Sequence, residues 1–244
     1  MSIFSSPSMV SEGLVLCLDA ANRDSYPGTG TAWTDLSGNG NNGTLTNGPT
    51  FNSANGGGIV FDGTDDYITV TENYGMKPSV LTAEIIFKIS SNTNTGYGGA
   101  PNSIQYLMFR QNSRTVTFEG YAIIYDEVSS SMYIYSASSS GPQYGISTPV
   151  NSLTLGTIYS ITSIWRFNTQ EIYINGKFIN SGIKAAGINY NNTHTLKIGR
   201  SVPVGTTFDA AFNGTVYLAK VYNRDLTAKE VLQNYNATRA RYGL

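Results

Sequence analysis

The sequence has little charge, one cysteine and one histidine. Only 13% of its 244 residues are charged, against roughly 25% in average soluble proteins. The single cysteine, Cys17, excludes a disulfide within the chain and stands among apolar residues, where a buried thiol is expected. The single histidine, His194, excludes metal sites and proton relays that need several imidazoles, and we assign it no role.

The charges that are present form no cluster. The net charge is −1, and the fifteen Lys and Arg residues are scattered singly, so we expect no nucleic acid partner. No stretch approaches the ~18 apolar residues of a membrane span, and we expect no membrane insertion. Residues 1–13 lack the basic and apolar regions of a signal peptide. Synthesis in the cytosol is therefore expected, with any export by another route.

Short runs rich in Ile, Val, Tyr and Phe recur along the chain, each bounded by Gly, Asn, Ser or Pro. In "EIYINGKFI" the pair Asn175-Gly176 separates two alternating runs, which predicts a tight hairpin because both residues tolerate positive φ. The expected strands are 13–20, 57–63, 66–70, 82–90, 104–110, 119–126, 131–137, 158–167, 170–176, 177–182, 195–200 and 214–222.

This spacing predicts an all-β fold, a two-sheet antiparallel jelly-roll sandwich, followed by a short C-terminal helix. Thr227 and Glu230 have the spacing of a capping box at the start of that helix. The residues that share one helical face are Ala228, Val231, Leu232 and Tyr235. One domain, 13–244, follows an N-terminal arm, 1–12, which is either a frayed terminus or a docking segment with Ile3, Phe4 and Met9 as apolar anchors.

The stretch "SGNGNNGTLTNGPTF", residues 37–51, is rich in Asn and Gly, which encode successive turns as readily as disorder. It lies between strand patterns and contains Leu45, Pro49 and Phe51, which a solvated linker would not need. We therefore expect an ordered multi-turn loop with a structural role.

Five motifs carry a family resemblance: "GLVLCLDAANRDSYPGTGTAWTDLSGNGNNGTLTNGPTF", "IVFDGTDDYITV", "LTAEIIFKI", "IYINGKFI" and "GTVYLAKVYNRDLTAKEVLQNYNATRARYGL". In this order the chain resembles a laminin-G-like, concanavalin A-like lectin/glucanase jelly-roll domain, in the form found in virion proteins of tailed phages. The resemblance implies two packed antiparallel sheets, carbohydrate binding on loops or the concave face, a bound calcium in some members, and glycanase activity in some relatives.

The glycanase relatives carry catalytic acids as Glu-x-Asp-x-x-Glu on one strand, which places two carboxylates in the groove. That motif is absent from this sequence. Asp126 and Glu127 are adjacent and would point to opposite faces of a strand, and Glu84 is expected on a sheet face. We therefore expect no enzyme, with a glycoside hydrolase kept as an alternative.

The turn "FDGTDDY" offers Asp62, Asp65 and Asp66 as calcium ligands. The alternative is that these side chains cap the turn by accepting from backbone N–H groups. Further acidic ligands of some relatives are missing, since Leu218 and Ala219 stand where those relatives often have Asp. Calcium is therefore possible but not required.

Sugar recognition uses aromatic faces and neutral polar groups, and the 17 Tyr residues with abundant Asn and Ser suit it. The same Tyr residues would suit half-buried sheet positions or a protein docking surface. Trp165 lies in a strand pattern and is expected in the core. Turn chemistry surrounds the loop aromatics that we select as carbohydrate-binding candidates: Tyr26, Trp33, Tyr74, Tyr97 and Tyr144.

The function that these observations predict is a non-catalytic phage protein at the virion surface, a head decoration or tail adhesin that binds host or environmental glycans. Its other partners would be virion proteins, and a homo-oligomer on the particle is the default expectation. The alternative is a purely structural capsid or tail decoration or assembly protein without glycan binding.

Overall fold

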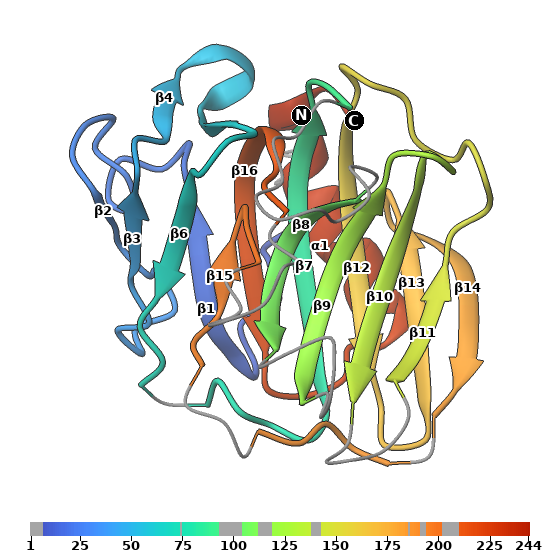
Figure 1. Cartoon of the computed structure of the whole chain (residues 1–244). Coiled ribbons are helices and arrows are strands. Elements are labelled where there is room, and N and C mark those ends of the chain that lie inside the picture. The colour runs from blue at the N-terminus through green and yellow to red at the C-terminus, as the bar shows by residue number, and fades with distance from the viewer. Residues whose placement is uncertain are drawn as a thin grey trace, which may run out of the picture.

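The computed structural model describes residues 7–73, 75–92, 104–111, 119–137, 143–184, 186–190, 194–201 and 210–244. Two eight-stranded antiparallel sheets pack face to face, and one helix, α1 (Ala228–Tyr242), lies across the outer face of one of them (Figure 1). The predicted all-β sandwich with a C-terminal helix is confirmed. Within the described residues, no helix is long and apolar enough to cross a membrane.

We call the sheet under α1 the back sheet and the other the front sheet. The back sheet has the order β14 (Lys177–Ile183), β13 (Thr169–Ile174), β12 (Ile158–Trp165), β7 (Leu81–Ile89), β16 (Asn213–Tyr222), β5 (Gly58–Asp62) and β4 (Thr50–Asn52), and β1 (Leu14–Asp19) also pairs with β16. The front sheet has the order β11 (Gln143–Ser147), β10 (Ser131–Ala137), β9 (Gly120–Asp126), β8 (Ile104–Gln111), β15 (Lys197–Ile198), β6 (Tyr67–Val70), β3 (Gly43–Thr46) and β2 (Ala32–Trp33). A 3-10 turn, η1 (Ala54–Gly56), joins β4 to β5.

All twelve predicted strands are present, and β2, β3, β4 and β11 are additional. The stretch 37–51 is therefore not only a loop, because it contains β3 and the start of β4. Its anchors behave as expected, since Leu45 is buried and Phe51 packs against the core. Gly43 lies so close to β6 that a Cβ would stand 2.9 Å from Cγ2 of Ile68. This close approach requires a glycine. Because glycine is unfavourable within strands, residue propensity does not predict a strand here.

The main core fills the space between the sheets. Trp33 and Trp165 are fully buried in it, so the prediction for Trp165 is confirmed. The ring of Tyr121 on β9 contacts that of Trp165 on β12, with centroids 5.2 Å apart. This aromatic pair spans the two sheets and contributes about 1 kcal/mol beyond its buried area.

A buried ion pair lies on the outer face of the back sheet. Nζ of Lys220 on β16 lies 2.9 Å from Oε1 of Glu84, the residue directly opposite on β7, and both side chains are at most 1% exposed. Asn234 of α1 donates to Oε2 of Glu84 at 3.1 Å and to the hydroxyl of Tyr222 at 3.0 Å. The helix therefore covers the pair and supplies one of its hydrogen bonds.

The capping box of α1 is confirmed at Thr227 and Glu230, but only Val231 of the predicted helical face is buried. Leu232 is 46% exposed and Tyr235 is half-buried. The buried side chains of the helix are Val231, Asn234, Thr238 and Tyr242. In this orientation the Asn234 side chain reaches the buried Glu84 and Tyr222 of the sheet.

Residues 7–12 pack against their own domain. The backbone of Val10 donates to Oδ1 of Asn234 at 2.9 Å and accepts from the Tyr222 hydroxyl at 3.0 Å. Met9 lies 3.7 Å from Nζ of Lys220 through its sulfur. The other expected anchors, Ile3 and Phe4, lie outside the described residues. This part of the arm therefore helps to cover the buried ion pair.

We expect Lys220→Ala to lower the free energy of unfolding by about 3–5 kcal/mol, because it leaves the Glu84 carboxylate buried without its counter-charge. Urea denaturation at pH 7 measures the loss. Lys229→Ala, an exposed position on the same helix-bearing face, is the control and should change the value by less than about 0.5 kcal/mol.

The double variant Glu84→Gln/Lys220→Met separates charge from packing, because Gln still accepts from Asn234 and Met refills the volume. We expect it to recover at least half of the stability lost in Lys220→Ala. A double variant that is no more stable than the single one would contradict the assigned cause.

Candidate functional site

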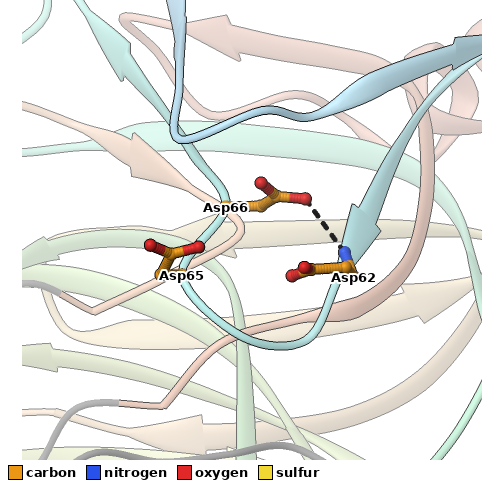
Figure 2. A group of neighbouring side chains, drawn as sticks. All are labelled: Asp62, Asp65 and Asp66. Atoms are coloured by element: carbon orange, nitrogen blue, oxygen red, sulfur yellow. Dashed lines mark hydrogen bonds between the residues drawn. The ribbon is translucent and has the colours of Figure 1, made fainter.

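Three aspartates converge at the turn between β5 and β6. The potential ligand oxygens of Asp62, Asp65 and Asp66 all lie within 4.8 Å of one another, and Figure 2 shows the three side chains around the turn. Gly63 has φ +82° there, a conformation that favours glycine. The sequence motif therefore does bring its three carboxylates together.

Two of these carboxylates bond the backbone of the turn. Oδ2 of Asp66 accepts from the N–H of Asp62 at 3.0 Å, drawn as the dashed line in Figure 2. Oδ1 of Asp62 accepts from the N–H of Thr64 at 2.7 Å. The turn-capping role that the sequence left open is thus realised.

The backbone carbonyls of the turn are also engaged. The carbonyl of Asp62 accepts from Nδ2 of Asn213 at 3.1 Å, and that of Asp65 accepts from Asn47 and from the Arg200 guanidinium, each at 3.0 Å. Calcium takes six to eight oxygens, usually carboxylates and carbonyls. The described residues offer it three carboxylates beside a cationic side chain, which is an incomplete calcium shell.

Burial raises the pKa of Asp66 from 3.8 to about 6. The hydrogen bond from Asp62 opposes this shift, and the nearby charges of Asp62 and Asp65 add to it. The side chain is only 4% exposed. A buried carboxylate with a raised pKa makes the stability of the turn sensitive to pH.

The aromatic candidates do not form a common site. Tyr26 is 2% exposed and Trp33, on β2, is fully buried. The Tyr26 hydroxyl donates back to the carbonyl of Gly30 at 2.7 Å, and its ring contacts that of Trp33. In contrast to the expectation of exposed loop rings, both belong to the core and neither presents a face to a sugar.

Of the remaining aromatic candidates, Tyr144 lies on β11 rather than in a loop and is half-buried. It lies opposite Ser136 on β10. Its side chain is on the same side of β11 as that of Ile146, which packs against the main core. Tyr74 and Tyr97 lie outside the described residues.

The carboxylates considered for catalysis have structural partners. Glu84 is held in the ion pair with Lys220. Asp126 accepts from the N–H of Ser129 at 2.8 Å, and Glu127 accepts from Nε2 of Gln105 at the same distance. Each of the three carboxylates thus has a structural partner.

The outer side of the front sheet carries an aromatic face that the sequence analysis missed. We use this name for Ile104, Tyr106, Phe109, Ala122, Ile124, Tyr133 and Tyr135, which pack together with Ala210. The rings of Tyr133 and Tyr135 on β10 are nearly parallel, at 9°, with centroids 5.9 Å apart. Both are half-buried, whereas Tyr106 and Phe109 beside them are buried.

Two local features build this face. A bulge on β8 between Tyr106 and Met108 turns Leu107 and Met108 into the main core, which leaves Tyr106 and Phe109 on the outer side. On β11, Gly145 lies opposite Tyr135, and a Cβ there would approach that ring at 2.6 Å. The alternation "YIY" in the sequence was the available signal that Tyr133 and Tyr135 share one side.

We expect the stability of the protein to depend on Asp66 between pH 4 and 7. The pKa of Asp66 is raised in the folded state, so the folded protein binds the proton more tightly than the unfolded chain does. Protonated Asp66 therefore stabilises the fold below about pH 4, and this stabilisation is lost as the pH rises through about 6. Asp66→Asn keeps the acceptor for the Asp62 N–H and removes the titration. It should therefore gain about 1–3 kcal/mol relative to the wild type between pH 5 and 7.

Urea denaturation across this pH range measures that difference, with the exposed Asp24→Asn as control. A wild-type-minus-variant difference that stays flat from pH 4 to 7 would refute the prediction. Adding calcium separates the two roles of the turn. A cation bound among the carboxylates moves the transition to lower pH, and a turn cap alone leaves it in place.

The fold has counterparts among solved structures. The binding domain of botulinum neurotoxin DC in complex with SialylT superposes with a TM-score of 0.67 at 14% identity, covering 93% of this chain and 52% of that chain. The same domain in complex with rat synaptotagmin II gives 0.66 with the same coverage. Domain 4 of AbnA, a GH43 extracellular arabinanase from Geobacillus stearothermophilus, in complex with arabinotriose, gives 0.66 at 15% identity, covering 91% and 98%.

The chain thus spans about half the length of the toxin domains and nearly all of the arabinanase domain. At these identities the likeness concerns the fold alone. No curated protein sequence matches the chain. A family model described as the concanavalin A-like lectin/glucanases superfamily (Laminin_G_3) matches residues 62–232. With two packed antiparallel sheets in place and more than half of its length matched, the chain belongs to the concanavalin A-like lectin/glucanases superfamily.

Proposed function

We propose that this chain is a non-catalytic glycan-binding protein that holds saccharides on Tyr133 and Tyr135, the two partly exposed tyrosines of the aromatic face. The observation that carries the proposal is the pair Tyr133 and Tyr135, two nearly parallel and partly exposed rings. Aromatic faces of this kind stack on the C–H faces of sugars, and sites for small ligands combine them with a few polar groups.

The neighbouring folds support this proposal. The arabinanase domain was solved with arabinotriose, and a related toxin study names two ganglioside molecules. The arabinanase domain, which this chain covers almost completely, is thus the stronger support, because the chain covers only 52% of the toxin chain. The absence of charge on most of the chain, with 13% charged residues, suits ligands that are recognised through hydroxyls.

The setting that we propose is the surface of a phage particle, as a head decoration or tail adhesin. The support for it is the resemblance of the five sequence motifs to virion proteins of tailed phages. Many copies in a homo-oligomeric array would raise avidity without new contacts. A purely structural decoration protein is the alternative, and it needs no glycan.

We expect Tyr133→Ala and Tyr135→Ala each to weaken glycan binding about three- to tenfold, which corresponds to the loss of one stacking contact of roughly 0.5–1.5 kcal/mol. A glycan array probed with the multimerised protein identifies the ligand, and titration calorimetry measures the affinities. Phe167→Ala is the control, because Phe167 is 57% exposed and lies in the β12–β13 turn.

Thermal unfolding of each variant confirms that the sheet is intact before binding is compared. An array without any bound glycan would refute the proposal and favour the structural decoration. Release of reducing ends from a bound polysaccharide would instead establish the glycoside hydrolase alternative.

A further inference from the structure

A groove lies between α1 and the β13–β14 hairpin, on the side of the molecule where Figure 1 places these elements together. Its volume is about 620 Å³, within the range of small-ligand sites. It shares no residue with the aromatic face. The side chains that carry the argument are Asn175, Lys177, Leu232, Tyr235, Asn236 and Arg239.

The hairpin turn determines how closely the helix can approach. Gly176 has φ +73°, and a Cβ on it would stand 3.0 Å from the Tyr235 ring. The ring therefore lies directly beside the turn. Oδ1 of Asn175 accepts from the N–H of Ser160 at 2.9 Å, which leaves the amide nitrogen of Asn175 as the group for a ligand.

The groove is cationic. Lys177 and Arg239 are both exposed, and no lining residue is acidic. Within the described part of the chain, neither cation forms an ion pair, whereas Arg110, Arg166, Arg224 and Arg241 all do. Two cations without a carboxylate in one groove favour an anionic occupant.

The other residues that line the groove indicate which kind of anionic ligand it would bind. Leu232, 46% exposed, and the face of the Tyr235 ring turned away from the Arg239 guanidinium, whose Cζ lies 5.8 Å from the ring centroid, form an apolar surface. Asn175 and Asn236 add neutral amides that bond hydroxyls. A ring with one apolar side, several hydroxyls and a negative group satisfies all of these features, whereas an inorganic anion would leave the apolar surface unused.

We propose that this groove binds an acidic saccharide, whose carboxylate or sulfate group lies between Lys177 and Arg239 and whose ring packs on Tyr235. The inference rests on the proposed glycan-binding function and adds a second site with a defined ligand class. Arg239 also lies in the last turn of α1, where a cation stabilises the helix end. Lys177, on the hairpin, has no such second role and is the more discriminating position.

The test compares acidic saccharides with their neutral counterparts. Oligogalacturonate is paired with its methyl ester, and sulfated heparin oligosaccharides are paired with desulfated ones, so that the two arms separate carboxylate from sulfate. At 50 mM NaCl the wild type should prefer the acidic member of at least one pair by fivefold or more. That preference should fall as salt is raised to 300 mM, because exposed charges are screened.

In Lys177→Gln the preference should fall two- to fivefold, and in Lys177→Gln/Arg239→Gln it should disappear. Lys229→Gln removes an exposed cation from α1 outside the groove and should leave the preference unchanged.

The possible failures are distinguishable. If glycans bind but acidic members are not preferred, or if the preference survives in the double variant, the groove proposal is refuted while the proposed function stands. If no saccharide of either kind binds, both are refuted. If the double variant is unfolded by circular dichroism, Lys177→Gln alone decides the matter through the salt dependence of its binding.

Discussion

The buried ion pair between Glu84 and Lys220 determines how the rest of the back face is built. Two charges removed from water need a covering that also supplies hydrogen bonds. Helix α1 provides Asn234 for this purpose, and the backbone of Val10 completes the contacts of that amide. The helix is therefore oriented by a polar contact, and this orientation turns Leu232 and Tyr235 away from the sheet and into the groove.

Most of the fold can be predicted from the sequence, because alternation of side chains shows which residues share one side of a strand. The strands that escaped prediction have other reasons for their residues. Gly43 is required by its approach to Ile68, and β2, with two residues, is too short for any pattern. Such strands form because a neighbouring strand pairs with them. That partner is distant in the sequence and cannot be identified from the residues of the strand itself.

The candidate site shows the same difference between features that depend on neighbouring residues and features that depend on distant ones. The aspartates of the β5–β6 turn were predictable because a tight turn brings near residues together. The aromatic residues were not, since turn chemistry around Tyr26 indicates a loop but does not give the direction of the ring. For Tyr133 and Tyr135 the alternation fixed a common side. Which side is the outer one depends on the packing of the two sheets, and this is a property of the whole chain.

Only 13% of the residues are charged, so two cations that line one groove without a carboxylate have a larger effect on the local potential. Four of the seven arginines in the described residues are matched by carboxylates, and Lys177 and Arg239 are two unmatched cations that line the same groove. The two sites that we propose would thus offer two kinds of contact, ring stacking at Tyr133 and Tyr135 and a charge contact in the groove. Because stacking is insensitive to salt and the charge contact is screened within about 10 Å, ionic strength would change which saccharides the protein prefers without abolishing its binding.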